Sequence, residues 1–479
     1  MNKPILFFLL LLFLPSCLIG QEIIKSKGLK NKSNGFTKVV GENIDGVFVI
    51  HHKNHTLNGD FYIEKFDHDL AKSSINKILI PKATLENVIV QKHSISYLTQ
   101  EGKRLKGEKI FRFTSMTSAT YQRLSSSAIR FTNYNFSQES SLIHTRSDKM
   151  KTTFAAAVKN GKKSGLEIMQ VLNNNDIQKV ASINTQYGLN ELSYIDIVND
   201  AFNNTYILGL IKSGFQKAPQ YVLFMHNSIS GEVIEKKLNN DKTHLSSVSM
   251  NYDELNKRMN LFSFYGDALN QNKGYMFVSY GGSDNQRLEV AFKDFDSEFK
   301  EELLGVNRTN NGSQLSNFHV KGFKSKENGG IVIIAEKFES INKTEIQFVN
   351  GVAQPMTRTV YNFDDVIILS IDSKGEIEWN RKINKKQNTM YDGGFYSSIQ
   401  VVFTEYNMYV LYNDKMNTSG NVMQYKIDLN GEVTEEVIMK SVNYYQYIIP
   451  VQGGQIGYNR VAIPSTINRT TKLLKFIYN

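Results

Sequence analysis

The chain contains very little cysteine: one residue, Cys17, in 479. Beyond that position the sequence offers no thiol, so disulfides, cysteine metal sites and cysteine nucleophiles are excluded there. Proline and tryptophan are also scarce, at 7 and 1 residues, whereas phenylalanine and tyrosine number 29 and 24. Aromatic-rich, proline-poor sequence with many Asn and Gly residues favours β-strands joined by tight turns.

Long hydrophobic runs are restricted to the start of the chain. Residues 5–14, ILFFLLLLFL, are ten apolar residues in succession, too few to cross a hydrocarbon core of about 30 Å. A head with one lysine, a short apolar run and small residues after it are typical of a secretory signal. The sequence therefore predicts an exported protein with no second membrane span.

Two cleavage positions fit this signal, and they predict different locations. Cleavage after Gly20 leaves Gln21 first, whereas the frame Leu14-Pro15-Ser16-Cys17 resembles a bacterial lipoprotein signal. That resemblance implies a diacylated Cys17, and two acyl chains are what stable anchoring needs. We expect a periplasmic protein, an outer-membrane or cell-surface lipoprotein, or a secreted one, with any membrane contact through Cys17 alone.

The chain divides into three segments by composition. Residues 1–20 form the signal peptide, or residues 1–16 in the lipoprotein case. Residues 21–35, which begin QEIIKSKGLKNKSN, are predicted to be a polar tether, and residues 36–479 the folded domain.

Signatures of catalysis are missing. The sequence has no HExxH, GxSxG, P-loop or GxGxxG motif, so no cofactor or metal is predicted and an enzymatic role is not favoured. Two pairs of neighbouring aspartates, Asp294 with Asp296 and Asp364 with Asp365, are interpreted as turn-forming residues, because Asp bonds readily to nearby backbone.

Three histidines lie close together in the segment HHKNH, at His51, His52 and His55. A metal site needs several imidazoles that converge on one point. Neighbouring residues of a strand point to opposite faces, so at most one of the first two can pair with His55. We interpret the first two as an exposed pair that flanks a turn.

Positive charge is concentrated in one stretch. Residues 101–165 hold 13 Lys or Arg and 4 Asp or Glu, a net charge of +9 of the chain's +10. This stretch is a candidate surface for an anionic partner, and its plainer interpretation is a solvated outer face. No aromatic-and-basic motif accompanies it, so nucleic acid is not expected. The candidate residues are Lys103, Arg104, Lys106, Lys109, Arg112, Lys159, Lys162 and Lys163.

A strand–turn–strand pattern recurs along the chain. Its clearest copy is DDVIILSIDSKGEIEWNRKI at residues 364–383, and a second is NVMQYKIDLNGEVTEEVIM at residues 421–439. Five weaker copies begin at residues 60, 94, 166, 220 and 287. Seven such units about 35 to 80 residues apart indicate a diverged repeat array, in which units that cannot bury both faces alone stack into a ring.

The copy at residues 364–383 resembles a blade of the quinoprotein-type (PQQ-like) β-propeller repeats, in which an Asp…Gly turn leads to a tryptophan, here Trp379. The resemblance implies an all-β propeller of seven or eight irregular four-stranded blades, and it implies no quinone cofactor. The final residues are expected to pair with an N-terminal strand and close the ring. Two β-sandwich domains that divide near residues 190–250 are the alternative architecture.

The functional expectation follows from fold class and compartment. We expect an exported binding or scaffold propeller of the cell envelope whose partner is a protein or a glycan. The alternative is a propeller enzyme that acts on envelope or extracellular glycans. The polar stretch at residues 114–141 suits adaptable contacts, although an outer strand or insertion loop explains it equally simply.

Overall fold

A computed structural model describes most of the chain. The described residues are 21–28, 37–52, 58–80, 82–103, 107–136, 142–146, 151–212, 217–281, 290–304, 315–349, 352–390, 392–415, 420–440, 446–467 and 470–478. Cys17 and the predicted signal peptide lie outside these residues.

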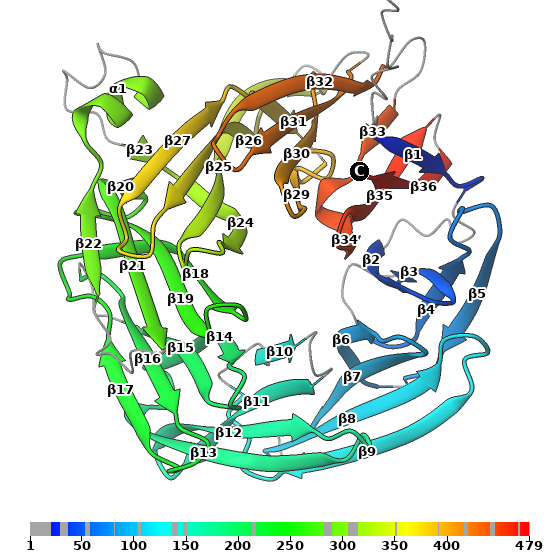
Figure 1. Cartoon of the computed structure of the whole chain (residues 1–479), viewed down its shortest axis with the longest axis vertical. Coiled ribbons are helices and arrows are strands. Elements are labelled where there is room, and N and C mark those ends of the chain that lie inside the picture. The colour runs from blue at the N-terminus through cyan, green and yellow to red at the C-terminus, as the bar shows by residue number, and fades with distance from the viewer. Residues whose placement is uncertain are drawn as a thin grey trace, which may run out of the picture.

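The described residues form eight antiparallel sheets of four or five strands, arranged in a ring (Figure 1). In seven of these sheets the first strand lies nearest the centre of the ring and the next three follow outward, whereas in the eighth β1 (Glu22–Lys25) lies at the end of the strand order opposite β33 (Gln446–Ile448). This arrangement is a β-propeller, and the sheets are called blades 1 to 8. Within a blade the strands are lettered a to d from the centre outward.

Blades 1 to 4 each consist of four consecutive strands. Their bounds are β2 Thr37–Asn43, β3 Gly46–His51, β4 Phe61–Phe66, β5 Ser73–Ile78; β6 Thr84–Val90, β7 Ser94–Lys103, β8 Glu108–Thr117, β9 Arg123–Phe131; β10 Leu142–Arg146, β11 Lys151–Asn160, β12 Lys163–Val171, β13 Ile177–Gly188; β14 Leu192–Asn199, β15 Thr205–Ile211, β16 Gln220–His226 and β17 Val233–Lys237.

Blades 5 to 7 follow the same plan with additions. Their bounds are β18 His244–Asp253, β19 Arg258–Gly266, β21 Gly274–Gly281, β22 Ala291–Asp294; β24 Phe318–Ser325, β25 Ile331–Val349, β26 Val352–Ile371, β27 Ile377–Ile383, β28 Gln387–Met390; β29 Gln400–Phe403, β30 Asn407–Asn413, β31 Val422–Asp428 and β32 Val433–Met439. A two-stranded pair joins β20 Gln271–Asn272 to β23 Leu315–Ser316.

Blade 8 joins the two ends of the described chain. It contains β33 Gln446–Ile448, the 3-10 helix η2 Pro450–Gln452, β34 Gly454–Gly457, β35 Arg460–Ile467, β36 Thr470–Ile477 and β1 Glu22–Lys25. Strand β1 pairs antiparallel with β36, and Figure 1 shows the blue strand beside the red ones. Pairing of an N-terminal strand with the last segment closes the ring as predicted. Within the predicted tether at residues 21–35, the segment Glu22–Lys25 is instead strand β1, in which Ile23 and Ile24 lie opposite Phe476 and Lys475.

The core is divided among the seams between blades. The buried apolar side chains form eight clusters, and each cluster draws on two neighbouring blades, including one that joins blade 8 to blade 1. A continuous succession of seams is incompatible with two separate sandwich domains. The strand–turn–strand units found in the sequence fall one each in blades 1 to 7, and blade 8 is the closing unit.

The two clearest repeats fold into the same turn. The Oδ1 of Asp372 accepts hydrogen bonds from the N–H groups of Lys374 and Glu376, both at 2.8 Å, and Gly375 completes the turn with a φ of 83°. Asp428 and Gly431 repeat this geometry in blade 7, with a φ of 80° at the glycine. These turns confirm the sequence interpretation of the Asp…Gly pattern.

One predicted strand is a helix. The copy at residue 287 was expected to end in a second strand, but Ser297–Leu304 forms helix α1, at the outer edge of blade 5 in Figure 1. Asp296 precedes it, and its Oδ1 accepts the N–H of Phe299 at 2.7 Å, as an N-cap residue does. Phe299 and Leu303 are buried one helical turn apart, which is a 3.6-residue period.

Candidate functional site

The structure separates the predicted basic residues. Arg104 and Lys106 lie outside the described residues, and Lys103 ends β7 with a side chain that is not described. The others lie on two neighbouring b–c hairpins, β7–β8 and β11–β12. The members on β8 are Lys109 and Arg112, and those at the β11–β12 turn are Lys159, Lys162 and Lys163.

Their environments differ, so they do not form one uniform surface. Lys159, Lys162 and Lys163 are exposed. The Lys109 ammonium instead lies over the rings of Tyr134 and Phe136, 5.2 and 5.6 Å from their centroids, and burial lowers its pKa. The exposed lysines agree with the plainer interpretation of a solvated face.

The histidine pair is not exposed, which corrects the sequence interpretation. His51 and His52 are both buried. The Nε2 of His51 lies 3.1 Å from Oε2 of Glu64, and its Nδ1 lies 3.2 Å from the hydroxyl of Thr37. His55 lies outside the described residues, and the described part of the chain holds no group of three potential metal-binding side chains. His51 is therefore a hydrogen-bonded core residue.

Blade 6 contains the most irregular region of the ring. Phe338 pairs with Phe363 and Glu336 with Val366, so Asp364 and Asp365 of β26 together face the single residue Lys337 of β25. On the other side of β26 the partner changes from β27 to β28, and the intervening residues 384–386 leave the ladder. The ladder is thus interrupted at one level across three strands, as at a β-bulge, which re-aims side chains.

This interruption forms a polar pocket of about 370 Å³. Every lining residue comes from the break: Lys337, Asp364, Asp365, Asn384, Lys385 and Lys386. Sequence reasoning identified the aspartate pair but assigned it to a turn, whereas the structure places both residues inside a strand.

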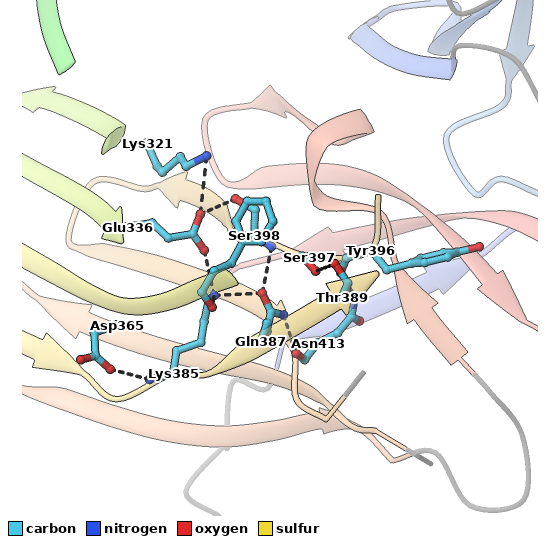
Figure 2. Close-up of polar contacts among 11 residues, drawn as sticks. Lys321, Glu336, Asp365, Lys385, Gln387, Thr389, Tyr396, Ser397, Ser398 and Asn413 are labelled. Atoms are coloured by element: carbon cyan, nitrogen blue, oxygen red, sulfur yellow. Dashed lines mark hydrogen bonds and ion pairs between the residues drawn. The ribbon is translucent and has the colours of Figure 1, made fainter. Parts of the chain in front are cut away.

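Lys385 turns from the pocket into the seam between blades 6 and 7 (Figure 2). Its ammonium lies 2.8 Å from Oε1 of Glu336, and both side chains are 0% exposed. It also donates to the carbonyl of Phe363 at 2.7 Å and to Oε1 of Gln387 at 2.9 Å. The ammonium of Lys321 approaches the same carboxylate at 3.5 Å. A buried ion pair needs such additional bonds to offset desolvation.

The network continues into blade 7. The hydroxyl of Ser398 donates to Oε2 of Glu336 at 2.5 Å, and its N–H donates to Oε1 of Gln387 at 2.9 Å. Ser398 has a φ of 74°, a left-handed conformation that is strained for a serine and is held by these two bonds. Gln387 donates to the carbonyl of Asn413 at 2.6 Å, and Asn413 in turn donates to that of Ile448 at 2.8 Å. The network thereby ties blades 6, 7 and 8 together.

Two charged residues of this site, Lys385 and Asp365, are held by ion pairs with neighbouring groups. Lys385 is enclosed by its partners, and burial lowers its pKa although Glu336 opposes the shift. Asp365 lies 3.3 Å from the ammonium of Lys382. Burial raises the pKa of Asp364, opposed by Lys337 and Lys385. A cluster of compensated charges at a break in a sheet is suited to hold the blade in register.

Beyond the break, β25 and β26 continue as a projecting two-stranded ribbon. They are 19 and 20 residues long, against 7 each for β15 and β16 of blade 4. Register pairs Ile346 with Pro355 and Phe348 with Ala353, so these four residues share one face. Ile346 and Phe348 are 70% and 77% exposed.

The two faces of the ribbon differ in charge. Below the apolar tip, the same face carries the hydrogen-bonded pairs Thr344 with Thr357 at 3.0 Å and Asn342 with Thr359 at 2.8 Å. The opposite face carries Lys343, Arg358 and Glu345, and Arg358 lies 3.4 Å from Glu345. No strand of the described chain pairs with residues 341–349 or 352–359 on their outer edges. The ribbon therefore presents one uncharged face, and no described strand pairs with its outer edges.

Bulges also recur in the inner strands. The register of β6 shifts around Glu86, and that of β14 shifts between Tyr194 and Asp196. Burial raises the pKa of Glu86 to about 7, with Lys109 and Gln100 acting in the opposite direction. Burial likewise raises the pKa of Asp196 to about 6, opposed by its bond to the N–H of Ile197.

Comparison with known proteins adds little to this description. No known protein family and no curated protein matches the chain in sequence. Among solved structures, the chain is similar to Sqt1 of Chaetomium thermophilum, with a TM-score of 0.47, 9% identity, and coverage of 95% of this chain and 97% of that one. A polysaccharide lyase, Uly1, has a TM-score of 0.42 at 10% identity, covering 95% and 98% of the two chains. The β-propeller domain of Nup133 from Vanderwaltozyma polyspora has a TM-score of 0.40 at 10% identity, covering 83% and 100%.

The fold itself therefore defines the class: the chain is a β-propeller. These likenesses are too distant to support a function, and the proposals below rest on the chain's own residues.

Proposed function

We propose that the chain is a binding or scaffold propeller of the cell envelope that captures a protein partner with the ribbon of blade 6. One observation supports this above others: Ile346 and Phe348 lie on the uncharged face of the ribbon and are 70% and 77% exposed. Large apolar side chains that are grouped on a surface commonly mark an interaction site, whereas single exposed apolar side chains do not.

The outer edges of the ribbon, which have no described strand beside them, favour a protein partner over a lipid surface. Backbone N–H and C=O groups along residues 341–349 and 352–359 have no described strand beside them. Lipid cannot satisfy such groups, because hydrocarbon offers no hydrogen bonds. An extended segment of another protein can satisfy these groups, because it adds a strand to the edge of the ribbon. In such complexes, pockets on the binding protein accept alternate side chains of the added strand.

The polar network around Lys385 fixes the position at which the ribbon leaves blade 6. Glu336 and Phe363 lie where the ribbon leaves the blade, and both contact Lys385. A ribbon anchored by buried bonds loses less conformational freedom on binding than a loose loop would.

The ribbon can be tested in the full chain with a matched control. Replacing Ile346 and Phe348 together by Ser removes the apolar tip, whereas Ile229→Ser with Leu255→Ser removes two other exposed apolar side chains from turns in blades 4 and 5. Tagged proteins would be cross-linked in envelope fractions of the native host, and captured proteins quantified. We expect the wild type and the control variant to capture one partner in the same ratio of partner to tagged protein. The ribbon variant should not capture it.

Equal capture by all three proteins would contradict the proposal. So would a ribbon variant that differs from wild type only in binding to lipid vesicles, because the occupant would then be a membrane. Thermal unfolding of each variant separates loss of binding from loss of fold.

The envelope location is a separate part of the proposal. It rests on the apolar run of residues 5–14 and on the frame around Cys17. Among the described residues, no helix is long and apolar enough to span a membrane. The mass of the mature N-terminal peptide from the native host decides between a diacylated Cys17 and a soluble protein that begins at Gln21.

A further inference from the structure

A second cavity lies in the seam between blades 1 and 2, far in sequence from the ribbon. Its volume is about 290 Å³. One wall comes from the connection between the blades: Leu79, which is exposed, together with the buried Ile80 and Ala83. The opposite wall is the face of blade 2 and is polar.

Strand register assembles this polar wall. Tyr97 of β7 lies opposite Thr114 of β8, and Thr99 lies opposite Arg112. Opposed residues share a face, and Glu101 follows on the same face two residues beyond Thr99. The phenol, two hydroxyls, the guanidinium and the carboxylate therefore line one groove.

A bulge adds a second guanidinium. Ser115 pairs with Ser125 and Met116 with Arg123, so the register of β9 shifts by one residue at Leu124. The shift turns Arg123 to the face that holds Arg112, whereas regular alternation would place it on the other face. Both arginines line the cavity.

Neither guanidinium is neutralised within the described chain. No ion pair within 4.0 Å joins Arg112 or Arg123 to a described carboxylate. Burial raises the pKa of Tyr97, and the bond to Thr114 and the charges of Arg123 and Arg112 oppose this rise, which places both guanidiniums near the phenol. The groove thus holds two positive charges and one negative charge beside hydroxyl groups.

We propose that this groove binds a hydroxylated carboxylate, such as a sugar acid, either as a free acid or as a uronate residue of a glycan. Arg112 and Arg123 recognise the carboxylate, because guanidinium groups match its geometry with paired hydrogen bonds. The hydroxyls of Tyr97, Thr99 and Thr114 already bond to Thr114, to the carbonyl of Arg112 and to Ser126, respectively, and each oxygen can still accept a hydrogen bond from a ligand hydroxyl. This proposal is independent of the ribbon.

Glu101 narrows the choice among anions. Its carboxylate accepts hydrogen bonds from ligand hydroxyls and repels a second negative charge. A phosphate dianion is therefore disfavoured relative to a monocarboxylate that carries hydroxyls. The volume suits a ligand of about one sugar unit, since it lies near the small end of protein ligand sites.

The test uses calorimetric titration of the full chain at low ionic strength. The probes are sodium glucuronate, glucose, inorganic phosphate and a uronate oligosaccharide. Glucuronate is expected to bind at least about ten-fold more tightly than glucose or phosphate, the equivalent of one lost charged hydrogen bond. An oligosaccharide that binds more tightly than glucuronate assigns the site to a glycan, and equal affinity assigns it to a free acid.

Matched variants decide the residues. Arg112→Gln with Arg123→Gln should weaken glucuronate binding by about ten-fold or more, whereas Lys236→Gln with Lys237→Gln, the same charge change on exposed β17, should leave it unchanged. Glu101→Gln should tighten phosphate binding relative to glucuronate.

Equal weakening by both double variants would show a nonspecific charge effect and overturn the proposal, as would undetectable glucuronate binding by the wild type. Arg123→Gln alone, at an exposed position, serves if the double variant fails to fold, and unchanged affinity there also overturns the proposal.

Discussion

Two seams of the same ring hold charge in opposite ways. Between blades 6 and 7, Lys385 and Glu336 are enclosed together, with Ser398 and Gln387 satisfying their remaining groups. Between blades 1 and 2, the guanidiniums of Arg112 and Arg123 line an open groove and pair with no described carboxylate.

The difference shows that a count of charged residues does not locate a binding site. The pocket at the blade 6 break contains more charged residues than the blade 1–2 groove, yet two of them, Asp365 and Lys385, are already held in ion pairs. A charge that already has its partner contributes to folding, whereas one without a partner can contribute to binding. The free energy of unfolding of variants tests this distinction, from the largest expected change to the smallest.

The largest change is expected from Lys385→Met. The substitution leaves the carboxylate of Glu336 buried, with the hydrogen bond from Ser398 and with Lys321, at 3.5 Å, as the described cation that remains beside it. Removal of one partner of a buried pair costs about 3 to 5 kcal/mol in the free energy of unfolding. Urea denaturation followed by circular dichroism measures this as a shift of the midpoint.

The double variant Lys385→Met with Glu336→Leu is the control for this prediction. It removes both charges, so it should recover most of the lost stability. If the double variant is as unstable as the single one, packing rather than charge compensation holds the seam, and the comparison fails.

A smaller effect is expected at Glu86, a half-buried carboxyl of blade 2 whose pKa rises to about 7 mainly through burial. The unfolded chain has the ordinary value near 4.5, so between pH 4.5 and 7 the folded protein binds more protons than the unfolded one. Stability from this group is therefore full below pH 4.5, falls as the pH rises to 7, and is constant above that.

The loss is at most about 3 kcal/mol, and less where water reaches the carboxyl. Glu86→Gln should flatten the dependence of the unfolding midpoint on pH between 5 and 7. Asp196→Asn should flatten only the lower part of this range, since its pKa is raised to about 6. If the unfolding midpoint of Glu86→Gln depends on pH as that of the wild type does, groups other than Glu86 cause the pH dependence.

The sequence predicted local features of the fold well and missed those that depend on register. The turns at Asp372 and Asp428 follow from patterns within a few residues, and ring closure was expected from the final residues together with the propeller resemblance. The end of the copy at residue 287 was wrong because helical spacing after Asp296 was read as a strand.

Neither candidate site could be predicted in the same way. Glu336 meets Lys385 only because three strands lose their register at one level. Arg123 joins Arg112 only through a bulge in β9. Register shifts of this kind depend on pairing between distant segments, and one sequence carries no local signal for them. Of the residues that line the two pockets, the sequence singled out Arg112, within a larger basic stretch, and Asp364 and Asp365, as turn residues.

The contact between the two clearest repeats gives a third prediction. A Cβ atom on Gly431 would lie 2.7 Å from the ring of Trp379, and the φ of 80° is itself unfavourable for alanine. Gly431→Ala should cost about 1 to 3 kcal/mol in the free energy of unfolding. The same change at Gly231, which has a φ of 71° and open space around it, isolates the backbone part of this cost. Equal losses would show that the Trp379 contact contributes nothing to the blade 6–7 seam.

The smallest change is expected in the open groove and is the most direct test of the comparison. Arg123→Gln removes an exposed charge that has no described carboxylate partner, so the free energy of unfolding should change by less than about 0.5 kcal/mol. Because Arg112 lies in the same groove, relief of repulsion should make any change slightly stabilising at low ionic strength, and added salt should abolish it. Urea denaturation at two salt concentrations distinguishes these cases. A loss above about 1 kcal/mol would show that Arg123 is committed to an internal partner, as Lys385 is, and is therefore not free to bind a ligand.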